Sequence, residues 1–157
     1  MLNILDQIFA DKKKELPGTQ RQSPLSEIKQ RIGDQQLARD VFKALEKGDT
    51  SRIIAEIKPK TPFKGELRKG FDAKIIAGDY VEYGAATLSI LTESTYFGSS
   101  IKVFQEIRKI AAIPLLRKDF IFDATVPTSC LSEPLILIIV CFSTLIFTSF
   151  GISKSVP

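Results

Sequence analysis

Short apolar runs alternate with amphipathic segments along the chain from residue 53 onward. Three runs have the composition of buried strands, namely IIAEIK (53–58), AATLSILTE (85–93) and IPLLRKDF (113–120). Two segments between them have the periodicity of helices, AKIIAGDYVEY (73–83) and IKVFQEIRKIAA (101–112). Nearly continuous apolar strands separated by helices of this length are typical of parallel sheets. We therefore expect an α/β fold of successive βα units with right-handed crossovers.

Both expected helices carry boundary residues. Asp72 stands where the first helix needs an N-cap, and Gly84 stands where its C-terminus favours a left-handed residue. Either Ser99 or Ser100 can cap the second helix. The residues expected on the buried faces of the two helices are Ile76, Ala77, Tyr80, Val81, Ile101, Phe104 and Ile107.

The first sixteen residues, MLNILDQIFADKKKEL, predict an amphipathic helix. Apolar residues recur at helical spacing, but Asp6 and Asp11 interrupt them, which distinguishes the segment from a signal peptide. We therefore expect a cytoplasmic protein. The run Lys12–Lys14 is interpreted as a solvated helix face.

Composition narrows the chemistry that the chain can perform. A length of 157 residues fits one domain, and the net charge of +4 favours anionic partners without indicating a nucleic-acid-binding protein. The sequence contains no histidine. Acid and base chemistry must therefore come from Lys, Glu and Asp.

Charged residues stand at the ends of two predicted strands. Glu56 and Lys58 are two positions apart and so project to one side, and Lys118 occupies the equivalent place on the third strand. Functional side chains of parallel α/β sheets gather at the carboxyl ends of the strands. Two lysines and a glutamate beside apolar residues would suit a substrate with phosphate and carboxylate groups. The alternative interpretation is an exposed ion pair without function.

Three segments resemble the indole-3-glycerol-phosphate synthase family, whose fold is a (β/α)8 barrel. They are IIAEIKPKTPFKG, GAATLSILTESTYFGSS and IPLLRKDFIFD, in the order and at the spacing of that family. The helical leader, with ILDQI and PLSEIKQRI, is similar to the extension that precedes the first strand of the family. The resemblance covers residues 2–123. It implies an incomplete TIM barrel, the first three βα units preceded by an N-terminal helical extension.

The resemblance also implies a reaction. The family is a carboxy-lyase of tryptophan biosynthesis, which converts 1-(2-carboxyphenylamino)-1-deoxyribulose 5-phosphate to indole-3-glycerol phosphate with loss of carbon dioxide and water. By this resemblance, Lys118 is the general acid that protonates the ribulose carbonyl oxygen. Lys58 holds the anionic groups of the substrate, and Glu56 orients and electrostatically tunes the two lysines. No metal or organic cofactor is implied.

The resemblance places an apolar pocket for the anthranilate ring at Pro62, Phe97 and Phe120. In the loop that contains Pro62, the family usually has serine where this chain has Thr61 and Phe63. The implied partner is a phosphorylated small-molecule substrate, with no nucleic acid.

The composition changes after Asp123. The remaining residues include both cysteines and only two charged side chains, Glu133 and Lys154. A complete barrel of this kind needs about 250 residues. We therefore interpret residues 1–123 as the N-terminal part of the synthase domain and 124–157 as a divergent apolar tail, from a frameshift, an aberrant splice or a misplaced gene end.

Three further hypotheses concern the tail and the open barrel. The segment PLILIIV can instead be a degraded fourth strand. Residues 135–152 are eighteen uncharged, mostly apolar positions, which is the lower limit for a membrane anchor. A noncatalytic fragment could associate with a complementary half-barrel or with another tryptophan-pathway enzyme. Because three strands cannot close a barrel, we expect the isolated chain to be inactive and prone to aggregate.

Overall fold

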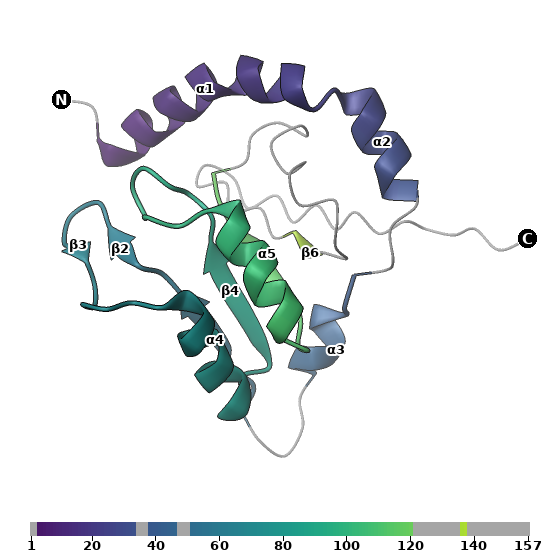
Figure 1. Ribbon diagram of the computed structural model, residues 1–157, viewed down its shortest axis with the longest axis vertical. Coiled ribbons are helices and arrows are strands. Elements are labelled where there is room, and N and C mark those ends of the chain that lie inside the picture. The colour runs from purple at the N-terminus through teal and green to yellow at the C-terminus, as the bar shows by residue number, and fades with distance from the viewer. Residues whose placement is uncertain (1–2, 34–37, 47–50, 121–135, 138–157) are drawn as a thin grey trace, which may run out of the picture.

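The computed structural model describes residues 3–33, 38–46, 51–120 and 136–137 (Figure 1). Its helices are α1 (Ile4–Gln22), α2 (Leu25–Gly33), α3 (Val41–Leu45), α4 (Ala73–Glu82) and α5 (Ile101–Ile110). Its strands are β1 (Ile54–Ile57), β2 (Lys60–Thr61), β3 (Gly65–Glu66), β4 (Thr87–Leu91), β5 (Leu115–Lys118) and β6 (Ile136–Leu137).

The main sheet is parallel, in the order β1-β4-β5-β6. Glu56 of β1 lies opposite Ser89 of β4, and Leu91 of β4 lies opposite Lys118 of β5. This confirms the expected α/β class with a parallel sheet. Two complete βα units and the third strand are described, whereas a helix after β5 would fall outside the described residues.

A short antiparallel hairpin of β2 and β3 follows β1. The hairpin pairs Thr61 with Gly65, and Pro62 lies in the turn between them. Gly65 has φ +64°, a conformation that most L-residues avoid.

The predicted helix boundaries are confirmed. The Asp72 carboxylate accepts hydrogen bonds from the backbone N–H groups of Lys74 and Ile75, and Gly84 follows α4 with φ +86°. Of the two candidate serines, Ser100 is the N-cap of α5, since its hydroxyl accepts from the N–H of Val103 at 3.3 Å.

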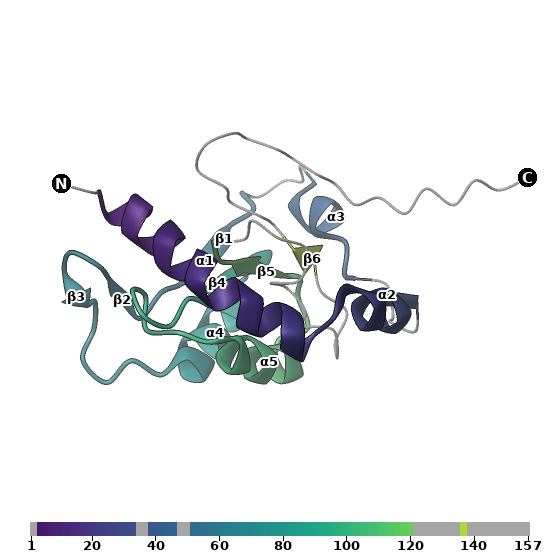
Figure 2. The same ribbon diagram turned by 90° about the horizontal axis from the view of Figure 1, so that it is seen from above.

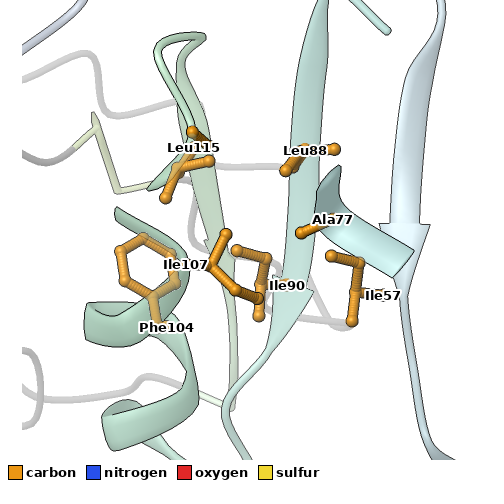
Figure 3. Packing of buried hydrophobic residues seen from close by; sticks show 8 residues of the cluster. Ile57, Ala77, Leu88, Ile90, Phe104, Ile107 and Leu115 are labelled. Atoms are coloured by element: carbon orange, nitrogen blue, oxygen red, sulfur yellow. The ribbon is translucent and has the colours of Figure 1, made fainter. Parts of the chain in front are cut away.

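The hydrophobic core lies between the sheet and the helices α4 and α5 (Figure 3). It contains Ile57, Ala77, Leu88, Ile90, Phe104, Ile107, Ala111 and Leu115. Ile76, Val81 and Ile101 pack against this cluster, as predicted. Tyr80 was wrongly placed among the buried residues. It is 37% exposed because it borders an open cavity beside β1.

Helix α1 confirms the predicted amphipathic N-terminal segment. Asn3 caps it by accepting from the N–H of Asp6 at 2.9 Å, and Ile8 on its inner side is buried. Figure 2 shows α1 crossing over the main sheet. Its contacts with residues that follow β4 and β5 place it at the carboxyl ends of these strands.

The tail is described only at Ile136 and Leu137, which lie within PLILIIV and form β6 parallel to β5. This agrees with the fourth-strand hypothesis for that segment. Both cysteines, and all residues of the proposed anchor except Ile136 and Leu137, lie outside the described residues. The division of the chain at Asp123 stays a prediction. Within the described ranges, none of the helices has the length and apolarity needed to cross a membrane.

Candidate active site

Glu56, Lys58 and Lys118 meet at the carboxyl end of the main sheet. One carboxylate oxygen of Glu56 accepts from Lys58 Nζ at 2.5 Å, and its other oxygen accepts from Lys118 Nζ. The contact between Glu56 and Lys118 crosses β4, where the residue paired with Glu56 is the small Ser89. The three predicted residues are therefore brought together, and none is fully buried.

The charges in this cluster favour an anion. Burial raises the pKa of Glu56, but hydrogen bonds from Lys118 and Lys58, together with their charges, outweigh it and leave the pKa below its usual value. Glu56 is therefore ionised at neutral pH. One negative and two positive groups leave a net positive site, which fits the phosphate and carboxylate chemistry expected from the sequence.

Aromatic rings lie at the same end of the sheet, on α1 and on residues that follow β4 and β5. The centroids of Phe97 and Phe120 are 6.0 Å apart with an interplanar angle of 33°. Phe9 of α1 meets Phe120 edge-on, with centroids 5.8 Å apart and an angle of 87°. Phe97 and Phe120, two of the three residues expected at the apolar pocket, thus lie against each other, and Phe9 joins them. The amphipathic pattern of α1 predicts an apolar face but could not identify its neighbours.

Pro62 lies in the turn of the β2–β3 hairpin, where it is half-buried. Thr61 helps to shape this turn, because its hydroxyl accepts from the N–H of Lys64 at 3.1 Å. Phe63, the second departure from the family, is 82% exposed. It contributes no buried surface to the site in this structure.

A cavity adjoins Glu56 and Lys58, but its lining does not include Lys118 or the rings of Phe9, Phe97 and Phe120. That cavity has a volume of about 370 Å³ and is bordered by Phe71 and by Ile76 and Tyr80 of α4, among others. It lies beside β1, which has no partner on that side among the described strands. Of the three charged residues, Glu56 and Lys58 border this cavity.

A buried network supports the backbone around Lys118. Arg117 and Asp119 flank Lys118 and are each 5% exposed. Asp119 accepts from Arg117 Nη2 and from the Thr92 hydroxyl, both at 2.7 Å, and from the N–H of Phe120 at 2.9 Å. The sequence pattern alone did not reveal this network, although the alternation within RKD puts Arg117 and Asp119 on the face opposite Lys118.

The described residues contain no group of three or more His, Cys, Asp or Glu side chains that could hold a metal ion. The groups that the candidate site presents are lysine ammonium, carboxylate and backbone groups. These can bind anions, transfer protons and orient a substrate.

Comparisons with known proteins agree with the geometry. The family model described as indole-3-glycerol phosphate synthase matches residues 5–143, which extends beyond Asp123. An indole-3-glycerol phosphate synthase of Burkholderia lata is 40% identical over 127 residues, which cover 79% of this chain and 48% of that protein. Enzymes with the same name from Burkholderia ambifaria and a Polaromonas species are 39% and 38% identical over the same coverage. The chain spans about half the length of the curated relatives it matches.

Proposed function

The chain belongs to the indole-3-glycerol phosphate synthase family, and from this premise we propose that it supplies the N-terminal part of a (β/α)8 barrel enzyme. The proposed reaction is the decarboxylating and dehydrating ring closure of 1-(2-carboxyphenylamino)-1-deoxyribulose 5-phosphate, a cytoplasmic step of tryptophan biosynthesis. The observation that carries the proposal is the contact of Glu56 with both Lys58 and Lys118 at the carboxyl end of the sheet.

Lys118 is proposed to act as the general acid. As the ring carbon attacks the ribulose carbonyl carbon, the carbonyl oxygen takes a proton from the Lys118 ammonium group. The substrate carboxylate then leaves as carbon dioxide, and the electron pair of its C–C bond restores the benzene ring. The new hydroxyl takes up a second proton and leaves as water, while the neighbouring carbon releases a proton as the double bond of the indole forms. Glu56 holds the ammonium group in place and so fixes the direction of proton transfer.

Lys58 is proposed to bind the anionic groups of the substrate. An ammonium group has three N–H donors, and the bond to Glu56 uses one of them. The aromatic surface of Phe97 and Phe120 is proposed to receive the anthranilate ring by stacking, with Pro62 on the neighbouring hairpin.

The proposal is tested with the 157-residue chain and a separately expressed C-terminal half of the Burkholderia lata relative. We expect the mixture to form indole-3-glycerol phosphate, and Lys118→Ala to lower its turnover by about 10²- to 10⁴-fold, the usual contribution of a general acid. Lys64→Ala, at the exposed hairpin turn, is the matched control. Turnover that survives Lys118→Ala would exclude the assigned role of Lys118.

We also propose that the free side of β1 is where a further strand of the barrel pairs. Among the described strands, β1 pairs only with β4. Ile53, which directly precedes β1, and Ile54, its first residue, are 58% and 47% exposed. An unpaired edge with apolar side chains is a template for another strand.

A further inference from the structure

Glu93 is a buried carboxylate that sequence analysis did not single out. It lies two residues after β4 and is 1% exposed. Its carboxylate accepts hydrogen bonds from three successive backbone N–H groups, those of Thr95 at 3.1 Å, Tyr96 at 2.6 Å and Phe97 at 3.1 Å. A buried charge of this kind is stable only when it is paired and hydrogen-bonded, so its three donors hold the loop in one conformation.

The same loop is held from its other end. The carbonyl of Phe97 accepts from the N–H of Lys60 at 3.3 Å. Gly98 has φ +66°, and a Cβ there would lie 3.1 Å from the Lys60 side chain. Both backbone groups of Phe97 are therefore fixed, the N–H by Glu93 and the carbonyl by the strand β2.

Glu93 also connects this loop to α1. Lys12 Nζ of α1 lies 3.7 Å from Glu93 Oε1, and the side chain of Lys12 is 15% exposed. Next to this ion pair, the Tyr96 hydroxyl donates to Asp11 Oδ2 at 2.7 Å. The helix that carries Phe9 is thus bound to the loop that carries Phe97, and Phe120 contacts both rings.

We propose that Glu93 is a positioning residue, which fixes Phe97 against Phe120 and docks α1 over the carboxyl end of the sheet. Glu93 acts through the loop, since its hydrogen bonds go to the backbone of residues 95–97 and its ion pair goes to Lys12. The inference rests on the proposed function only insofar as the aromatic surface receives a substrate ring. The positioning itself is a property of the fold.

The positioning is tested by NMR on the full chain. In Glu93→Ala, the amide protons of residues 95–97 should exchange at least about tenfold faster, since a hydrogen bond to a charged group contributes about 1.5–3 kcal/mol. The nuclear Overhauser contacts between the rings of Phe97 and Phe120 should also disappear. Glu93→Gln should give an intermediate result, because its amide oxygen still accepts but its charge is lost.

Glu66→Gln, on the exposed β3, is the matched control and should leave exchange unchanged. The amides of Leu88 and Ile90 report whether each variant keeps its core. Unchanged exchange at residues 95–97 in Glu93→Ala, with the core intact, would overturn the proposal. So would persistence of the ring contacts. If the amides of Leu88 and Ile90 lose their protection from exchange in Glu93→Ala, the variant has lost its core. The exchange of the same amides in Glu93→Gln then decides whether the proposal holds.

A second experiment asks whether Glu93 acts through Phe97. The probe is a substrate analogue whose ribulose carbonyl is reduced to an alcohol. Its dissociation constant is measured by calorimetry, in the presence of the same C-terminal half, for the unchanged chain, Glu93→Gln, Phe97→Leu and the double variant. If Glu93 acts through Phe97, the double variant binds no more weakly than Phe97→Leu. Independent, additive losses would overturn this step. If the unchanged chain fails to bind the probe, the proposed function loses support, while the NMR experiment still decides the positioning role.

Discussion

Glu56 shows how one residue can organise a site from two strands. Its carboxylate accepts from Lys58, which follows β1, and from Lys118 at the end of β5. Without this carboxylate, two ammonium groups would repel each other in the same space. The small Ser89 on the intervening strand lets the two groups meet. An exposed ion pair alone would carry little meaning, but a carboxylate shared by two strands at the functional edge of a parallel sheet fits a binding site.

We expect the stability of the fold to depend on acid through Asp119. Burial raises its pKa, but the charge of Arg117 and the hydrogen bonds from Thr92 and Arg117 outweigh it and lower the pKa below the ordinary 3.8. A lowered pKa in the folded state stabilises the fold above pH 3.8, and this contribution is lost as the pH falls through the folded pKa. In Asp119→Asn this acid-dependent loss should disappear, and stability near pH 7 should fall by about 3 kcal/mol because Arg117 loses its carboxylate.

The measurement is chemical denaturation from neutral pH down to below pH 3, for the full chain and the variant. Asp79→Asn, at an exposed position of α4, is the control and should follow the unchanged chain. Equal slopes of stability against pH for Asp119→Asn and the unchanged chain would contradict the assignment.

Most regular elements could be predicted, because their signals are local. The strands β1, β4 and β5 lie within the predicted apolar runs, and α4 and α5 begin after their predicted caps. The β2–β3 hairpin was missed as a sheet because it consists of only two residue pairs, which leave no periodicity to detect. The position of α1 was also missed. Its pattern predicts a buried face, but the partners of that face lie some 85 residues away in sequence.

Within the candidate site, too, residues with a local sequence signal could be predicted and residues defined by the folded conformation could not. Lys58 and Lys118 could be found from their place at strand ends and from the resemblance to the family. Glu93 could not, since its meaning comes from the loop conformation that brings three N–H groups to one carboxylate. The sequence signal for such a loop is Glu93 followed a few residues later by Gly98, and this signal is weak.

The docking of α1 can be followed through Tyr96. The hydrogen bond to Asp11 raises the pKa of the Tyr96 hydroxyl above 10.0, with smaller contributions from burial and from the charges of Asp11 and Glu93. Asp11→Asn should therefore lower the pKa of one tyrosine toward its ordinary value. An ultraviolet absorbance titration detects this change. The other two tyrosines, Tyr80 and Tyr83, serve as internal references.

A raised pKa in the folded state means that this contact is present at neutral pH and is lost as the pH rises through the folded pKa. Helix α1 should then loosen in strongly alkaline solution, and trypsin should cut faster at the exposed Lys13 and Lys14. A titration curve that is identical with and without Asp11→Asn would show that Asp11 does not contact Tyr96 in solution.

At the scale of the whole molecule, the sheet has two distinct parts: its carboxyl end, called the mouth, and the edge at β1, called the open side. The mouth is covered by α1 and carries the charged cluster and the aromatic rings. On the open side, β1 pairs only with β4 among the described strands, and apolar side chains on and near it reach solvent. The family fold explains this asymmetry, because in a closed barrel each strand has two neighbours and no edge remains.

The open side predicts self-association of the purified chain. Ile53 and Ile54 are exposed beside the edge of β1 that has no partner among the described strands, and such an edge is a template for pairing with another chain. Ile53→Lys places a charge at this edge and should reduce association, as edge lysines do in natural sheets. Ile110→Lys is the matched control, since Ile110 is similarly exposed, at 55%, but ends α5. Light scattering over a concentration series measures the mass. A monomer at every concentration, or equal relief of association by both lysines, would show that β1 is not the surface that associates.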